Sequence, residues 1–203
     1  MTSALVVLGG YLLGSMPFGY WIVRLFRGED VRRAGSGNIG ATNVWRTYGK
    51  SYGIPIVVLD IAKGFVPAAV GTLLVGELTG VLAGGAAMLG HWRPLFLRFQ
   101  KGGKTVAAGG GTLLGVAPLL GLLAVAIWIA AFLLTRYASV ASMLVAVSLP
   151  FVGIALGQPW PVIAFAAVAG LAVLVLHRSN IARLRDGTES RFRLRRSSSA
   201  TSR

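Results

Sequence analysis

Residues 54–75, which read IPIVVLDIAKGFVPAAVGTLLV, decide the class of fold. The stretch is apolar except for Thr72 and the charged pair Asp60 and Lys63, and a helix of about 20 apolar residues can cross the hydrocarbon core of a bilayer. Asp60 and Lys63 are three residues apart, so they lie on one helix face and can form an ion pair. We interpret the pair as structural, with orientation of a phosphate-binding residue as the alternative.

The composition of the whole chain agrees with a membrane protein. Of its 203 residues, 55% are hydrophobic and only 13% are charged, whereas about a quarter of the residues in a soluble domain are charged. We therefore predict an all-α integral membrane protein. One membrane domain is expected over residues 1–196, followed by a disordered basic tail over residues 197–203.

About seven transmembrane helices are expected from the apolar segments. Gly14, Ser15 and Pro17 interrupt the first segment and indicate a broken helix near its inner end. The fourth is short and rich in glycine, so a tilted or re-entrant helix is the alternative there. Apart from Lys63, every Lys and Arg falls on or near one set of connections, which places the N-terminus outside and the C-terminus in the cytoplasm. The segments are residues 5–26, 54–75, 81–99, 107–118, 119–134, 140–156 and 162–176.

Charge and residue counts exclude several kinds of site. The net charge of +14 comes from 20 Lys and Arg against 6 Asp and Glu. In a membrane protein it indicates cytoplasmic loops and binding of phosphate or anionic lipid, not of nucleic acid. The absence of cysteine excludes disulfides, thiolate metal sites and a cysteine nucleophile. With two histidines and six scattered acids, no metal centre and no cofactor are expected.

The connection at residues 35–50, GSGNIGATNVWRTYGK, is the strongest candidate for a binding site. Glycines let backbone N–H groups turn toward an anion, hydroxyl and amide side chains add neutral donors, and two cations supply charge. No carboxylate lies among them. We predict a phosphate-binding loop, with a flexible cytoplasmic connector as the alternative. The candidate ligands are Ser36, Asn38, Thr42, Asn43, Arg46 and Lys50.

A second basic connection, KGGKT at residues 101–105, falls on the same predicted side of the membrane. Its last three residues match the end of a nucleotide-binding P-loop, but Arg98 occupies the position of the first glycine in that motif. The motif therefore fails, and ATP hydrolysis is not expected. Lys101 and Lys104 are candidate phosphate ligands.

A third polar segment, HRSNIARLRDGTE at residues 177–189, follows the last apolar run. His177 and Asn180 are three residues apart, so they share a helix face and can jointly orient a hydroxyl group. Glu189 is interpreted first as a structural ion pair that holds the tail. Helix packing is likewise the simpler interpretation of Ser139 and Ser142, with ligand roles as the alternative.

Taken together, the motifs resemble those of the bacterial membrane glycerol-3-phosphate acyltransferases that use acyl phosphate as donor. The resemblance covers almost the whole chain and rests on several long motifs in the right order. Relatives often have proline at the position of Ile39 and glycine at that of Thr105, changes that alter backbone freedom without removing a donor group. The motifs are GSMPFGY at residues 14–20, GSGNIGATNVWRTYGK at 35–50, DIAKG at 60–64, GH at 90–91, KGGK at 101–104, TRYASVAS at 135–142 and HRSNIARLRDGTE at 177–189.

The resemblance implies transfer of a fatty acyl group from acyl phosphate to the 1-hydroxyl of glycerol 3-phosphate, giving lysophosphatidic acid. The expected partners are these two substrates and the lipid bilayer, at the cytoplasmic face of the bacterial inner membrane. The loop at residues 35–50 then resembles the binding site for acyl phosphate, and Lys104 with Lys101 resembles the binding site for glycerol 3-phosphate. Which cation binds which phosphate stays open. The implied catalytic residues are Arg46, Lys104, His177 and Asn180, and the implied substrate ligands add Ser36, Asn38, Thr42, Asn43, Lys50, Lys101, Ser139, Ser142 and Glu189.

The base for such a reaction is not fixed by the sequence. Soluble-type acyltransferases use a histidine with an aspartate five residues later, but Phe96 and Ala182 stand at that distance from His91 and His177. Because acyl phosphate is already activated, we expect positioning and charge neutralisation to dominate, with the donor's own phosphate accepting the proton. His177 as the base is the alternative. An anion transporter is the rival function, disfavoured because the outer turns hold no cation and the motifs show no inverted repeat.

Overall fold

A computed structural model gives the fold, and residues 1–192 are the part of the chain that it describes. Those residues form helices joined by short connections and contain no strand, so the predicted all-α class is confirmed. The predicted disordered tail at residues 197–203 lies outside the described residues. The helices are α1 (Thr2–Gly14), α2 (Phe18–Arg27), α3 (Ala41–Tyr48), α4 (Lys50–Leu74), α5 (Glu77–Trp92), α6 (Val106–Val116), α7 (Pro118–Thr135), α8 (Ala138–Ala155), α9 (Trp160–Leu176) and α10 (Arg178–Arg185), with 3-10 turns η1 (Val31–Arg33) and η2 (Leu95–Leu97).

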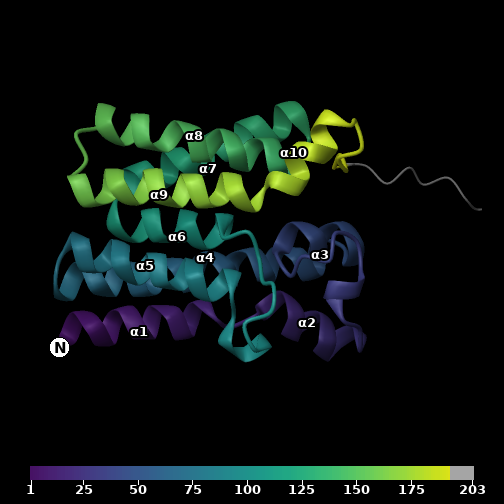
Figure 1. Cartoon of the computed structure of the whole chain (residues 1–203), viewed down its shortest axis with the longest axis horizontal. Helices are drawn as coiled ribbons and strands as arrows, with labels where there is room; N and C mark the ends of the chain where they lie inside the picture. The colour runs from purple at the N-terminus through teal and green to yellow at the C-terminus, as the bar shows by residue number, and fades with distance from the viewer. Residues whose placement is uncertain (193–203) are drawn as a thin grey trace, which may run out of the picture.

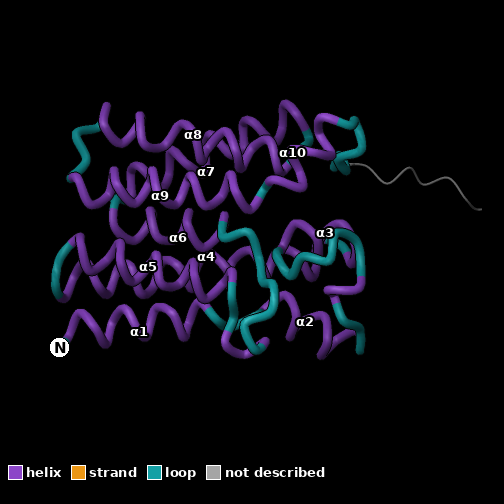
Figure 2. The backbone as a smooth tube through the Cα atoms, in the orientation of Figure 1, coloured by secondary structure: helices purple, strands orange, loops and turns teal. Residues whose placement is uncertain are grey.

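The long helices lie side by side, and the polar segments gather at one end of the bundle. In Figure 1, α1 and α4 to α9 run along the long axis, while α2, α3 and α10 lie at the end opposite the N-terminus. Figure 2 shows the long loop between α5 and α6 at the ends of those helices that face α2 and α3. The three motif-bearing segments predicted to share one side therefore do share one end of the molecule.

Within the described residues 1–192, the length and apolar character of the helices support four or five membrane spans. Four segments qualify on their own, namely Thr2–Arg27, Lys50–Leu74, Pro118–Thr135 and Ala138–Ala155. Trp160–Leu176 together with Arg178–Arg185, bent by 55°, makes a fifth. α5 has 16 residues and α6 has 11, which is short of the roughly 20 residues that an upright span needs. The expected number of seven stays a prediction.

Proline explains two helix boundaries, one that was expected and one that differs from the expectation. The first apolar segment breaks between α1 and α2, where Pro17 precedes the first residue of α2, as the Gly-Ser-Met-Pro sequence indicated. The segment expected at residues 81–99 ends as a helix at Trp92, because Pro94 follows and cannot continue a helix. The chain then turns through η2 into the basic connection.

The short helix α6 is shielded by close packing on α4. A Cβ added to Gly64 would lie 1.9 Å from the Ala108 backbone oxygen, and one added to Gly111 would lie 2.0 Å from that of Ile61. Only glycine permits this approach of two helix backbones, as small residues do in membrane interfaces generally. The glycine-rich helix is thus held inside the protein, which is what a short segment at membrane depth requires.

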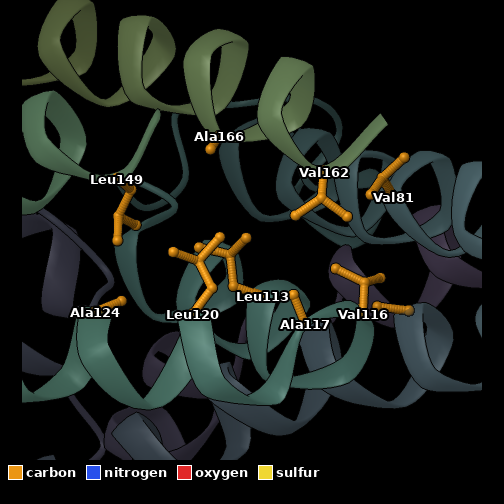
Figure 3. Packing of buried hydrophobic residues seen from close by; sticks show 10 residues of the cluster. Val81, Leu113, Val116, Ala117, Leu120, Ala124, Leu149, Val162 and Ala166 are labelled. Atoms are coloured by element: carbon orange, nitrogen blue, oxygen red, sulfur yellow. The ribbon is translucent and has the colours of Figure 1, made fainter. Parts of the chain in front are cut away.

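Two apolar clusters fix the bundle and its polar end. The larger joins α6 and α7 to α8 and α9, with Leu120 and Val162 fully buried at its centre (Figure 3). The smaller lies beneath the first glycine-rich loop and includes Ile39, Val44 and Ile56. The loop at residues 35–50 is therefore docked on a core of its own and is not a free connector.

Candidate active site

The glycine-rich loop is folded around one buried side chain, that of Asn43 in α3. Its Nδ2 donates to the backbone oxygens of Ala34 and Asn38, at 3.1 and 2.8 Å. Its Oδ1 accepts from the Ser36 backbone N–H at 2.8 Å. Both amide protons of Asn43 are thereby used inside the loop. In this structure Asn43, a predicted substrate ligand, shapes the loop and has no N–H left for a phosphate.

The other predicted ligands of this loop lie nearer its surface. Asn38 closes a turn by accepting the Gly40 backbone N–H at 2.7 Å. Ser36 and Lys50 are exposed and Thr42 is half-buried. These side chains lie at the polar end of the bundle, so the structure places them together without assigning them a ligand.

A hydrogen-bonded cluster unites the other two polar segments. The Lys104 ammonium group donates to Oδ1 of Asn180 in α10. Asn180 Nδ2 donates in turn to Glu189 Oε1 at 2.6 Å, and Ser139 Oγ of α8 donates to the same oxygen at 2.8 Å. The Arg183 guanidinium pairs with Glu189 Oε2 at 2.7 Å. Four of the predicted site residues, Ser139, Lys104, Asn180 and Glu189, are thus in one connected group.

Glu189 is the acceptor at the centre of this cluster. Burial alone would raise the pKa of its carboxyl group, but hydrogen bonds from Asn180, Ser139 and Arg183 outweigh burial and hold the pKa below its ordinary value. The Glu189 carboxylate is therefore charged at neutral pH, and both of its oxygens accept hydrogen bonds. The interpretation of Glu189 as an ion pair that holds the C-terminal segment agrees with these contacts.

His177 lies at the junction of α9 and α10 with its ring buried. Its Nδ1 is 2.8 Å from the Val173 backbone oxygen. Because a carbonyl oxygen only accepts, Nδ1 carries the proton in this contact and Nε2 keeps the lone pair. Nε2 is thus the ring atom that can accept a proton or a hydroxyl hydrogen bond. Within residues 1–192, the His177 side chain forms no hydrogen bond with the Lys104 cluster, so its part in the reaction stays a prediction.

The C-terminal segment joins the two halves of the site. Arg46 of α3 donates from Nη1 to the Ser190 backbone oxygen at 3.2 Å, and its guanidinium lies 5.9 Å from the Phe192 ring centroid. The Phe192 ring also contacts the rings of Trp45 in α3 and Phe132 in α7, and the Phe192 backbone N–H donates to the Arg136 backbone oxygen. Arg46 is thereby held by Ser190, the residue that follows Glu189 in the chain.

Two predicted site residues are placed apart from this group. Ser142 Oγ donates to the Ala138 backbone oxygen at 2.7 Å and accepts from Trp128 Nε1 at 3.1 Å, so helix packing describes it. Lys101 is exposed in the same connection as Lys104. Sequence reasoning missed Arg183 and Phe192. The one-turn spacing of Arg183 from Asn180 was an available signal, whereas the contacts of Phe192 depend on α3 and α7.

Comparison with known proteins identifies similar chains over almost the full length. The family model described as glycerol-3-phosphate acyltransferase matches residues 4–187. A glycerol-3-phosphate acyltransferase of Synechococcus sp. (strain JA-3-3Ab) is 44% identical over 192 residues, covering 95% of this chain and 94% of that one. One from Aquifex aeolicus is 42% identical, covering 95% of this chain and 100% of that one.

Solved structures agree with the sequence comparison. The crystal structure of PlsY (YgiH), an integral membrane glycerol 3-phosphate acyltransferase, in its glycerol 3-phosphate form superposes with a TM-score of 0.91 at 40% identity, covering 95% of this chain and 96% of that one. The lysophosphatidic acid form of PlsY gives a TM-score of 0.87 at 38% identity over the same shares.

Proposed function

We propose, from the premise that the chain belongs to the glycerol-3-phosphate acyltransferase family, that it takes its acyl group from acyl phosphate. The fatty acyl group would pass to the 1-hydroxyl of sn-glycerol 3-phosphate, giving lysophosphatidic acid for phospholipid synthesis. A solved relative was obtained in glycerol 3-phosphate and lysophosphatidic acid forms. Those two molecules match the proposed acceptor and product.

The observation that carries the proposal is the pairing of two cationic sites at one end of the bundle. Lys104 stands in the cluster with Asn180 and Glu189, and Arg46 reaches Ser190 beside it. Both proposed substrates carry a phosphate group, so two cationic sites close together suit the reaction. We assign the phosphate of glycerol 3-phosphate to Lys104 and that of the donor to the loop at residues 35–50 with Arg46.

The proposed chemistry needs no covalent enzyme intermediate. The 1-hydroxyl oxygen of glycerol 3-phosphate attacks the acyl carbon, and the new ester bond forms as the carbon–oxygen bond to phosphate breaks. Inorganic phosphate leaves with that bonding pair, and the hydroxyl proton passes to the donor's phosphate. The protein's contribution is to hold both substrates in line and to neutralise their charges.

His177→Ala tests the source of the base. A side-chain general base contributes about 10²- to 10⁴-fold to a rate, so proton transfer to the donor's phosphate predicts a fall in kcat of less than about 10-fold. Steady-state kinetics of the purified variant would measure this. Loss of all activity, with the fold and the binding of both substrates intact, would establish His177 Nε2 as the base.

The pH dependence of acceptor binding follows from Lys104, which lies outside the spans. Burial of the ammonium group, together with the charge of Arg183, lowers the pKa of Lys104 to about 8. Lys104 is charged below that pH and becomes neutral above it. The KM for glycerol 3-phosphate is therefore expected to rise as pH increases through about 8, while the KM for acyl phosphate changes less. A KM for glycerol 3-phosphate that stays constant from pH 7 to 9 would contradict the assignment.

We further propose that α1–α2 and α4 to α9 make seven crossings, with the N-terminus outside and the active site at the cytoplasmic face of the inner membrane. The chain has no cysteine, so single cysteines can report sidedness. A membrane-impermeant maleimide on intact cells is expected to label Glu77→Cys, at the first residue of α5, but not Arg98→Cys, between α5 and α6. Labelling of both, or of Arg98→Cys alone, would rule out this topology.

The experiment that tests the function uses purified protein, labelled glycerol 3-phosphate and either acyl phosphate or acyl-CoA. We expect labelled lysophosphatidic acid from acyl phosphate, with one inorganic phosphate released per product. If lysophosphatidic acid forms with acyl-CoA but not with acyl phosphate, acyl-CoA is the donor and the proposed donor is wrong. If neither donor gives product, the proposed reaction is rejected.

A further inference from the structure

A buried ionic network lies where α4, α5 and the break between α1 and α2 meet. Lys63 Nζ is 2.7 Å from Asp60 Oδ1, 2.5 Å from His91 Nδ1 and 3.3 Å from the Met16 backbone oxygen. Asp60, Lys63 and His91 are 2%, 1% and 4% exposed. The reaction proposed above does not use any of these groups.

The geometry fixes how the protons are arranged. A lysine ammonium group has three N–H donors and no acceptor, and Lys63 has three acceptors around it. His91 Nδ1 must keep its lone pair to accept from Lys63, so the proton of the neutral ring is on Nε2. The imidazole is therefore held in one orientation by Lys63, and Lys63 is held by Asp60.

The ring of His91 supports the loop that carries Lys104. A Cβ added to Gly103 would lie 1.8 Å from His91 Nε2, so the Gly103 backbone lies directly against the imidazole. The Gly103 and Gly102 N–H groups donate to the backbone oxygens of His91 and Trp92, both at 2.9 Å. Lys104 is the next residue, and its ammonium group reaches Asn180.

Stability gives little reason for charges at this place. A buried ion pair is worth little or nothing over apolar residues of the same size, and ionisable groups within a membrane are costly. An oriented imidazole, by contrast, provides a flat and rigid surface for the Gly103 backbone. Each member of the network thus connects to the loop through contacts seen in the structure.

We propose that Asp60, Lys63 and His91 are positioning residues, which hold the imidazole of His91 beneath Gly103 and thereby set the position of Lys104 toward the phosphate of glycerol 3-phosphate. This inference rests on the proposed role of Lys104. The network acts through the loop and does not touch the substrate.

The test replaces both charges at once, with Asp60→Leu and Lys63→Met combined. The double variant removes the ion pair without leaving an isolated buried charge, so it is expected to fold and insert. The KM for glycerol 3-phosphate is expected to rise about 10-fold or more, with a smaller change in the KM for acyl phosphate. Hydrogen exchange of the Gly102 and Gly103 amides is expected to accelerate about 10-fold, because the ring is no longer held.

Two comparisons separate positioning from general damage. Val162→Ala removes buried volume from the remote core and serves as a control for general loss of thermal stability. It should leave both KM values and the loop amides unchanged. In a Lys104→Gln background the double variant should add little to the KM defect, because the network acts through Lys104. His91→Phe keeps a ring of similar size without the Nδ1 acceptor. If the double variant does not fold, His91→Phe replaces it in the same measurements.

The inference is overturned if a folded network variant keeps the parent KM and parent amide exchange, or if Val162→Ala shifts them equally. Amide exchange requires no turnover, so it tests the network even if the unmodified protein makes no lysophosphatidic acid. Failure of the proposed function and failure of this inference therefore give different results.

Discussion

Replacing Lys104 with glutamine is expected to lower kcat/KM for glycerol 3-phosphate by about 10³-fold or more. Glutamine keeps an N–H donor that can reach Asn180 but removes the half-buried positive charge next to Glu189 and Arg183. The variant loses the charge-assisted hydrogen bond to the phosphate of glycerol 3-phosphate. It also loses the positioning of the 1-hydroxyl, and a misplacement of about 1 Å can cost about 10²-fold in rate. Steady-state kinetics of purified protein would give the value.

The control for this prediction is Arg98→Gln, which removes an exposed cation from the same connection. Its effect is expected to stay below about 3-fold, because an exposed charge is screened by solvent and salt. Equal losses in the two variants would mean that the loop requires overall positive charge and that Lys104 has no special position.

Replacing Arg46 with alanine is expected to abolish transfer, with a loss of about 10³-fold or more, while the protein stays folded and inserted. Arg46 is the cation assigned to the donor's phosphate, and a guanidinium offers paired N–H groups to phosphate oxygens. Its bond to the Ser190 oxygen also links α3 to the segment that carries Glu189. The measurement is lysophosphatidic acid formation at saturating glycerol 3-phosphate, beside thermal unfolding.

Two further variants make the Arg46 result specific. Arg46→Lys keeps the charge and loses the paired geometry, so partial recovery is expected. Arg33→Ala removes an exposed cation from the neighbouring turn η1 and should have little effect. Activity retained in Arg46→Ala would refute the assignment of the loop at residues 35–50 to the donor.

The fold class could be predicted from the apolar pattern, and the ends of the helices from the positions of glycine and proline. The ion pair of Asp60 and Lys63 was predicted from their spacing, and the structure confirms it at 2.7 Å. The sequence did not indicate that His91, on another helix, completes the network. That contact depends on the close packing of α5 on α4, where a Cβ added to Gly71 would lie 2.9 Å from the Gly80 Cα, a matter of tertiary structure.

The sequence predicted which residues gather at the candidate site, but not the hydrogen bonds that each of them makes there. The cluster of Lys104, Asn180 and Glu189 unites two segments that the sequence placed on one side. Asn43 and Ser142 have polar groups of the kind that bind substrates, but in this structure their hydrogen bonds are used within the loop and within the helix pair. A side chain's partners are set by the fold, so residue type alone cannot separate a substrate ligand from a structural amide or hydroxyl.

The most direct test of this account is a structure of the protein with glycerol 3-phosphate bound. We expect the phosphate group within hydrogen-bond distance of Lys104 Nζ, beside Asn180, and the 1-hydroxyl directed toward the loop at residues 35–50. Phosphate bound by Arg46 and the glycine-rich loop, with Lys104 still occupied only by Asn180, would contradict the assignment of the two sites.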